Sequence, residues 1–168
     1  MNLNLHALIN KKKFFLGTPL YFLSTSLARF PKFSMAELAM SQSVVLPPNL
    51  RTRKLIAENG LSGHLDKLLV AESLSFLDMI ALVQDSRLII TGSGGVQKEA
   101  FFYSVPYVTF RDETELVATI KTGWNRLVGA IHNRIIDATR LAHRSASQIK
   151  PYGKGDASFR ILETLRRS

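Results

Sequence analysis

The sequence predicts a single α/β domain, in which helices cover both faces of a parallel sheet. From Ser43 onward, short apolar runs alternate with stretches of helical period, and the loops between them are short. A length of 168 residues suits one domain with its own core and leaves no room for two. Hydrophobic residues form 46% of the chain and charged residues 21%, which are ordinary globular values and argue against wholesale disorder.

The expected strands are short runs rich in apolar and β-branched residues. The clearest is Arg-Leu-Ile-Ile-Thr at 87–91, a continuous run that is typical of a strand buried on both faces. Runs of this kind predict strands at 43–47, 67–70, 87–91, 107–110 and 126–128.

The expected helices lie between these strands and carry start and stop signals. Ser75 can cap a helix, and Asp78 three residues later completes a capping-box pattern. Gly60 stops the helix that precedes it. These signals and the helical period predict helices at 52–59, at 75–84, from the turn at 92–95 to about 103, at 115–121, at 131–146 and from 157 onward.

The first 33 residues show no sustained period and are interrupted by glycine and proline. Three consecutive lysines followed by the apolar stretch 14–23 resemble the charged and apolar parts of a secretory signal. The stretch is too short and too broken to span a bilayer. We therefore expect residues 1–33 to be an unstructured leader rather than a working signal, and residues 34–168 to be the folded domain.

The net charge of +9 is concentrated in the first third of the chain. Residues 1–53 hold seven Lys and Arg against one acid, whereas residues 54–168 hold fifteen against twelve. A basic segment of this kind can bind an acidic surface or nucleic acid. No aromatic RNA-binding motif or zinc-ligand spacing accompanies it, which makes nucleic acid the less favoured partner. A basic protein that binds through residues 1–53 remains an alternative.

The chain contains no cysteine, which excludes disulfides, thiolate metal sites and cysteine nucleophiles. This composition suits the reducing cytoplasm, where we expect the protein to act. His64, His132 and His143 show no ligand spacing, so we expect no metal and take these three to be solvated or edge residues. His6 lies in the first 33 residues.

The strongest local feature is the turn Thr91-Gly-Ser-Gly-Gly95 between the buried strand and the next helix. Glycines let a ligand approach the backbone, and successive amides at a helix start attract phosphate oxygens. The turn also follows the carboxyl end of a strand, where open α/β sheets bind ligands. It is not a Walker loop, and Gln97 stands in place of the third glycine of the dinucleotide fingerprint. By itself the turn is equally well explained as a tight connection.

Six strings, in order along residues 44–168, resemble signatures of the non-hydrolysing UDP-N-acetylglucosamine 2-epimerases. The central string, TGSGGVQKEA at 91–100, resembles the family's TDSGG-x-Q-x-EA motif, and RDETE at 111–115 resembles R-x-x-TE. The other four are RTRK at 51–54, LSFLD at 74–78, GWNRLVG at 123–129 and YGKGDAS at 152–158. The resemblance implies a Rossmann-like lobe equivalent to the C-terminal domain of a two-domain GT-B fold.

The resemblance also implies roles for residues of this chain. In such epimerases the Ser-Gly-Gly turn holds the UDP phosphates, which here implies Ser93, Gly94 and Gly95. The glutamate one turn into the helix binds the ribose hydroxyls, which implies Glu99, and a carboxylate can accept hydrogen bonds from two adjacent hydroxyls. Arg111 is either a phosphate contact or the ion-pair partner of a neighbouring acid, and the sequence leaves these alternatives even.

Several positions depart from the family's pattern. The aspartate of TDSGG is Gly92 here, and the histidine that precedes RTRK is Asn49. An aromatic residue that often stacks on uracil is replaced by Met79. Leu116 and Ala118 replace an Arg or Trp and a glutamate. Each change removes a polar or stacking partner from the implied site, so we expect weakened nucleotide binding.

The family's N-terminal domain, which supplies most of its acid–base residues, has no counterpart in the sequence. We therefore expect a truncated homologue of an isomerase that interconverts UDP-N-acetylglucosamine and UDP-N-acetylmannosamine for polysaccharide biosynthesis. It would retain mainly the UDP-binding lobe, be weak or inactive alone, have no catalytic residue of its own, and need no cofactor or metal. A non-catalytic uridine-nucleotide-binding remnant is the alternative. A partner chain that supplies the missing domain, and a homo-oligomer, both remain open.

Overall fold

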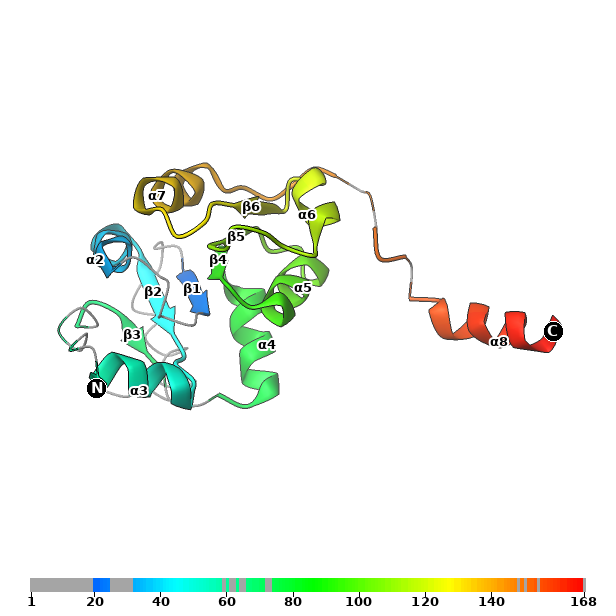
Figure 1. Ribbon diagram of the computed structural model, residues 1–168, viewed down its shortest axis with the longest axis horizontal. Helices are drawn as coiled ribbons and strands as arrows, with labels where there is room; N and C mark the ends of the chain where they lie inside the picture. The colour runs from blue at the N-terminus through cyan, green and yellow to red at the C-terminus, as the bar shows by residue number, and fades with distance from the viewer. Residues whose placement is uncertain are drawn as a thin grey trace.

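The computed structural model describes residues 20–24, 32–58, 60, 63, 66–71, 74–147, 149, 151–153 and 155–167. Its centre is a six-stranded sheet with the order β3-β2-β1-β4-β5-β6, in which every neighbouring pair is parallel (Figure 1). The strands are β1 (Leu20–Ser24), β2 (Ser43–Leu46), β3 (Leu69–Val70), β4 (Leu88–Thr91), β5 (Tyr107–Thr109) and β6 (Asn125–Leu127). This is the order of a doubly wound Rossmann-like sheet, and it reverses between β1 and β4.

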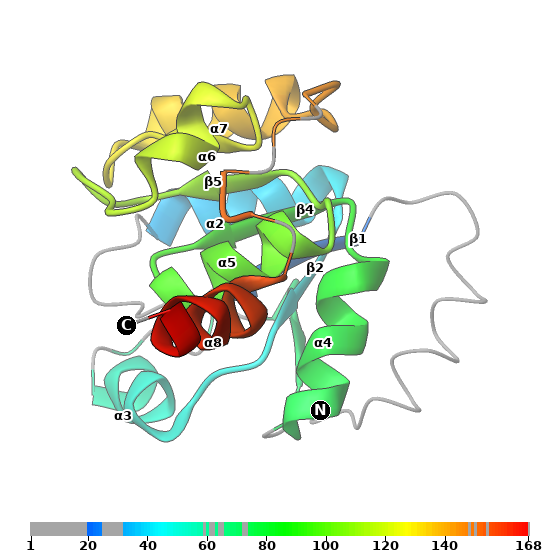
Figure 2. The same cartoon turned by 90° about the vertical axis from the view of Figure 1, so that its right-hand side faces the viewer.

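Helices alternate with the strands along the chain. They are α2 (Lys32–Ser41), α3 (Leu50–Glu58), α4 (Phe76–Asp85), α5 (Gly94–Phe102), α6 (Val117–Lys121), α7 (His132–Leu141) and α8 (Ala157–Arg167). Helices α2 and α7 cover one face of the sheet, and α4 and α5 cover the other (Figure 1). Figure 2 shows the same layers from the side, with α7 above β5 and with α4 and α5 below it.

Two apolar core clusters fill the spaces on the two faces, and β4 contributes alternate residues to them. Ile90 joins the cluster that includes Ile135 of α7, whereas Ile89 joins the cluster that includes Val83 of α4. All four side chains are completely buried. Every residue of β4 is buried, as expected for the continuous apolar run at 87–91.

Helix α8 differs from the other helices because none of its residues is buried. Figure 1 shows it standing away from the lobe, at the end of an extended segment that follows α7. Large apolar side chains on this helix are 55–66% exposed: Phe159, Ile161, Leu162 and Leu165. Arg160 lies on the other side of the helix, since it is about 100° from the nearest residues of this stripe. The helix is therefore amphipathic, and none of its residues is buried against the part of the chain that the structure describes.

The expected fold class is confirmed, and several elements fall where the sequence predicts them. The strands expected at 43–47, 87–91 and 107–110 match β2, β4 and β5 to within one residue at each end. The capping box is also present: Ser75 Oγ accepts from the Asp78 N–H at 3.2 Å, and the Ser75 N–H donates to the Asp78 carboxylate at 3.4 Å.

The expectation that residues 1–33 form a leader outside the fold is wrong for residues 20–24. These residues form β1, which pairs with β2 on one side and β4 on the other. A short apolar run after a lysine cluster has the same composition in a signal segment and in a central strand, so periodicity could not separate them. The expected boundary at residue 33 also falls inside α2, a helix that the sequence reading missed. The lysine cluster at 11–13, the glycine and prolines at 17, 19 and 31, and both His6 and His64 lie outside the described residues.

Three expected elements are longer than the observed ones. The strand at 67–70 is reduced to β3, and the helix at 115–121 begins only at Val117. The helix at 131–146 ends at Leu141, because Ala142 takes up extended backbone angles (φ −70°, ψ 127°). Element ends depend on such local geometry more than on hydrophobic period.

Candidate functional site

The glycine turn joins the end of β4 to the first turn of α5. Thr91 is the last residue of β4 and is completely buried. Ser93 is the N-cap of α5 with extended backbone angles (φ −93°, ψ 123°), and its N–H donates to Thr91 Oγ1 at 3.0 Å. The Gln97 N–H donates to the Ser93 carbonyl at 3.0 Å and starts the helical ladder. The shape of the turn is therefore fixed by the protein itself.

The first amides of α5 are open at this turn. Ser93 makes no side-chain cap hydrogen bond to the helix. The N–H groups of Gly94, Gly95 and Val96 have no acceptor within the helix, because the first turn of any helix lacks one. Among the described residues, a Cβ added to Gly94 would meet no atom within 4 Å, and one added to Gly95 would meet only Ser93 Oγ at 3.8 Å. An uncapped helix N-terminus with free space beside it attracts an anion.

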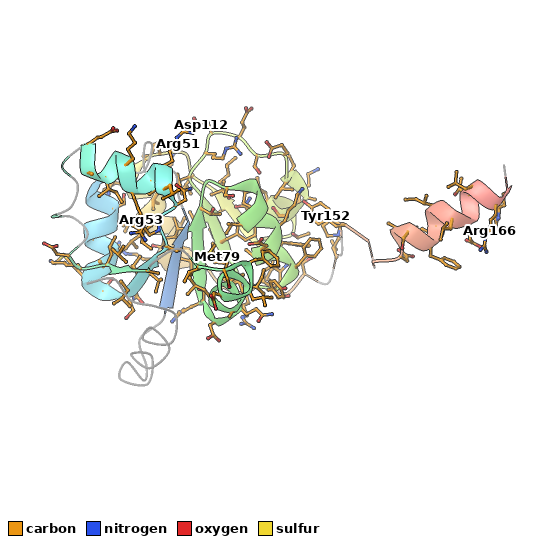
Figure 3. The ribbon with its side chains drawn as sticks, turned by 90° about the horizontal axis from the view of Figure 1, so that it is seen from below. Arg51, Arg53, Met79, Asp112, Tyr152 and Arg166 are labelled. Carbon is orange, nitrogen blue, oxygen red and sulfur yellow. The ribbon has the colours of Figure 1, made fainter. Side chains whose placement is uncertain are left out.

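The loops that follow the neighbouring strands meet at the same edge of the sheet, since all the strands are parallel. The Phe110 N–H donates to the Thr91 carbonyl at 3.3 Å, and the Gly129 N–H donates to the Arg111 carbonyl at 3.0 Å. Figure 3 shows Arg51 and Asp112 on one side of the lobe. The carboxyl edge of the sheet is thus lined by loops that are bonded to one another.

Glu99 lies one helical turn after Gly95 on the same side of α5, because residues four apart share a helix face. Its side chain is partly buried, and this burial raises the pKa of the carboxyl above its ordinary value. Within the described residues, Glu99 forms no ion pair with Lys98 or any other cation. Its carboxylate is therefore available to a ligand at the edge of the sheet.

Arg111 forms an ion pair with Glu115, with 3.9 Å between Nη1 and the carboxylate. The side chains of Arg111 and Glu115 are 40% and 75% exposed, so the pair is open to water and weak. The ion-pair alternative of the sequence reading is thus observed. It leaves most of the five guanidinium N–H donors of Arg111 available for a phosphate.

A hydrogen bond to a buried side chain of α5 stabilises the site, and the sequence did not predict this contact. Gln97 is completely buried, and its Oε1 accepts from Thr114 Oγ1 at 2.9 Å. Thr114 Oγ1 in turn accepts from the Leu116 N–H at 3.2 Å. The contact ties α5 to the loop that carries Arg111. The signal lay in the Q and T of the two motifs, to which the sequence analysis assigned no role.

The departures from the family's pattern have structural roles of their own. Asn49 accepts from the Thr52 N–H at 2.8 Å and so caps α3. Met79 is partly buried against the core on the α4 side of the sheet, and Leu116 is 6% exposed. Met79 and Leu116 therefore pack within the lobe and supply no polar or aromatic group at its edge.

Ser34, His132 and Glu37 form a polar link between α2 and α7. Ser34 Oγ lies 2.8 Å from His132 Nδ1, and His132 Nε2 lies 3.2 Å from the Glu37 carboxylate, which Arg140 also contacts at 3.2 Å. The His132 side chain is 35% exposed, as expected for a solvated or edge residue, but both of its ring nitrogens also have partners, which the sequence did not indicate. The set has the composition of a catalytic triad, but Ser34 is completely buried and no substrate can reach it.

Two of the cations in and next to the basic segment, Arg53 and Lys54, have hydrogen-bond or ion-pair partners within the lobe. Arg53 donates to the carbonyls of Ala71 at 3.0 Å and Pro48 at 3.3 Å. Lys54 pairs with Glu58 at 3.7 Å, and Arg51 is exposed. Of these three cations, only Arg51 has no hydrogen-bond or ion-pair partner among the described residues.

Two kinds of site are missing from the described residues. No group of three or more His, Asp or Glu residues there is arranged to hold a metal ion. Nor do these residues include a helix with the length and hydropathy needed to span a bilayer. A groove of about 500 Å³ runs along β6 between α6 and α7, lined among others by Arg126, Arg134 and Asp137, and contains none of the glycine-turn residues.

Comparisons with known proteins agree on one family. The sequence model of the UDP-N-acetylglucosamine 2-epimerase family matches residues 31–166. A UDP-2,3-diacetamido-2,3-dideoxy-D-glucuronate 2-epimerase from Pseudomonas aeruginosa is 44% identical over 126 residues, which are 74% of this chain and 35% of the relative. A UDP-N-acetylglucosamine 2-epimerase homolog from Methanococcus maripaludis is 34% identical over 163 residues, which are 94% of this chain and 46% of the relative.

A solved structure extends the agreement to the fold. The UDP-GlcNAc 2-epimerase from Methanocaldococcus jannaschii, in complex with UDP-GlcNAc and UDP, matches with a TM-score of 0.72 at 28% identity. The match covers 95% of this chain and 49% of that one, so the present chain spans half or less of the relatives that it matches. The family match includes the glycine turn, Glu99 and Arg111. The chain belongs to the UDP-N-acetylglucosamine 2-epimerase family, and it corresponds to the C-terminal lobe of that GT-B fold.

Proposed function

We propose that this lobe binds the UDP part of a UDP-sugar at the N-terminus of α5. The observation that carries the proposal is the open first turn of that helix, where the amides of Gly94 and Gly95 have free space beside them. Backbone amides at a helix N-terminus bind phosphate through both their hydrogen bonds and the helix dipole. The position at the carboxyl edge of a parallel sheet supports the same ligand class.

Each remaining residue of the site has a task that its chemistry fits. Ser93 and the two glycines hold the phosphates, and Arg111 adds a charged donor from the next loop. Glu99 accepts hydrogen bonds from the ribose hydroxyls one helical turn away. Its raised pKa reflects a partly desolvated carboxylate, and hydrogen bonds from hydroxyl groups strengthen in such surroundings.

The relatives share UDP in their names and differ in the sugar. One is named for UDP-2,3-diacetamido-2,3-dideoxy-D-glucuronate and the other for UDP-N-acetylglucosamine. Interconversion of UDP-N-acetylglucosamine and UDP-N-acetylmannosamine is the activity that we propose for a complete two-lobe assembly. The lobe described here contributes the nucleotide site to that assembly, and the cytoplasm is the compartment that we propose for it.

A partner lobe is part of this proposal. The apolar side of α8 has no cover within the described residues, and the relatives are about twice as long as this chain. An exposed apolar stripe of this kind is typical of an interaction surface. We propose that an N-terminal lobe covers it, and a second copy of this chain is the competing occupant.

Calorimetric titration with UDP tests the proposal. The expected dissociation constant is about 0.1–1 mM, equivalent to about −4 to −5.5 kcal/mol. Glu99→Ala should abolish the binding heat, whereas Lys98→Ala, a change at the exposed neighbouring position on α5, should leave it intact. Equal UDP affinity in wild type and Glu99→Ala would show that the ribose assignment is wrong.

A further inference from the structure

Gly92 opens the phosphate turn, but the backbone does not require a glycine there. The described glycines with positive φ are Gly60, Gly123, Gly129, Gly153 and Gly155. Gly92 is not among them, so an L-residue can adopt its backbone angles. What excludes a side chain is space: a Cβ built on Gly92 would lie 3.1 Å from both Cε2 and Cζ of the Phe110 ring, closer than nine in ten real Cβ contacts.

The Phe110 ring is held in this position by the core. Phe110 is 3% exposed and belongs to the same apolar cluster as Ile90 and Val128. Its backbone is fixed as well, because its N–H donates to the Thr91 carbonyl at 3.3 Å and the preceding Thr109 pairs with Thr91 across the two strands. A Cβ at position 92 would require this ring to shift by a few tenths of an ångström against the packing behind it.

We propose that Phe110 is a positioning residue for the phosphate turn. Its ring fills the space that a side chain at position 92 would take, and so sets the path of the backbone from Thr91 to Ser93. The turn is then anchored at its first residue and open at Gly94, where an added Cβ meets nothing. The role of the turn in holding phosphate rests on the proposed function, whereas the contact between Gly92 and Phe110 does not.

The contact also couples the side chains that positions 92 and 110 can hold: the size of one limits the size of the other. A side chain at position 92 avoids this close contact only if the residue at 110 is smaller than phenylalanine. An aspartate at 92, the residue of the family motif, would add a carboxylate beyond the crowded Cβ. Restoring that acid by one substitution would therefore distort the turn instead of repairing the site.

A double-mutant cycle of Gly92→Ala and Phe110→Leu tests the pairing by thermal unfolding. Gly92→Ala alone should lower Tm by about 3–10 °C, the range for overpacking a core position in a domain of this size. In the Phe110→Leu background the same substitution should lower Tm by less than half as much. Gly94→Ala is the matched control, because its Cβ meets no atom within 4 Å, and it should not lower Tm.

Two further readouts separate positioning of the turn from general stability. Hydrogen exchange of the Gln97 amide, which bonds the Ser93 carbonyl, should be about threefold faster or more in Gly92→Ala, and UDP affinity should fall by a similar factor. Both should recover in the double variant. Additive Tm effects, or unchanged Gln97 exchange in Gly92→Ala, would overturn the inference. If wild type does not bind UDP, the proposed function fails, but Tm and Gln97 exchange still decide this inference.

Discussion

Helices α5 and α8 have similar lengths and follow glycine-containing turns, yet their surroundings are opposite. Helix α5 buries Val96, Gln97 and Ala100 against the sheet. Helix α8 buries nothing, although its apolar stripe is the more regular of the two. Figure 3 shows the difference directly, since Arg166 of α8 lies far from the labelled residues of the lobe. Helix α5 has its packing partners within this lobe. Helix α8 would need another surface to cover its apolar side, and the described residues do not provide one.

This contrast between α5 and α8 implies that the lobe can bind UDP by itself but cannot turn over a UDP-sugar. The groups proposed to hold UDP are on α5 and the loops bonded to it, so they keep their geometry without α8. The groups needed to act on the sugar must face it from the other side of a closed cleft. We therefore expect changes near α5 to affect both stability and UDP binding, and changes on α8 to affect only association.

The largest expected effect is the absence of epimerase turnover by this chain alone. Each general acid or base group typically supplies about 10²–10⁴-fold in rate, and we assign none to this lobe. The measurement is incubation with UDP-N-acetylglucosamine, followed by detection of the manno epimer or of deuterium entering carbon 2 from heavy water. Turnover at ordinary enzyme rates would mean that groups in this chain carry the chemistry.

The second expected effect is a loss of stability when the contact below α5 is broken. Thr114→Val keeps the shape of the side chain but leaves Gln97 Oε1 and the Leu116 N–H without this partner. We expect a loss of about 1–3 kcal/mol in the free energy of unfolding, measured by urea denaturation. Thr164→Val on α8 is the matched control, and its exposed position predicts a change within about 0.5 kcal/mol. Equal losses at both positions would remove the contrast between the helices.

The third expected effect is that a neutral side chain at position 99 weakens UDP binding without lowering thermal stability. Glu99→Gln should weaken UDP binding by about 3- to 10-fold, because a neutral acceptor replaces a charged one. It should not lower Tm at neutral pH. Burial raises the pKa of the Glu99 carboxyl in the folded state. Above that pKa the carboxylate is ionised and destabilises the folded state. This destabilisation is lost as the pH falls through the folded-state pKa. Thermal unfolding at pH 4 and pH 7 checks the sign, and a lower Tm for the variant at pH 7 would contradict it.

The smallest expected effect on stability comes from α8 itself. Replacing Leu162 and Leu165 by serine should change Tm by less than about 2 °C, because both side chains are more than half exposed. The same change should reduce self-association in concentrated samples, measured by analytical ultracentrifugation. A large fall in Tm would show that α8 packs on the lobe in solution.

The sequence predicts the parts of the fold that carry local signals. The apolar run at 87–91 predicts a buried strand, and Ser75 with Asp78 predicts the start of a helix. The glycine turn between strand and helix indicates the position of the candidate site. The strand at 20–24 was missed because its identity depends on pairing with β2 and β4, which no local pattern shows. The contacts of Gln97 and Phe110 also join segments that are far apart in the chain, so neither could be read from spacing alone.

A titration of ¹⁵N-labelled protein with UDP, followed by amide chemical shifts, tests the central claim most directly. We predict saturable shifts at Gly94, Gly95 and Val96, with a dissociation constant of about 0.1–1 mM and no shifts in α8. The α8 amides serve as the internal control, since that helix is remote from the turn (Figure 1). Shifts confined to the groove along β6, or none at UDP concentrations up to about ten times the upper end of that range, would contradict the account.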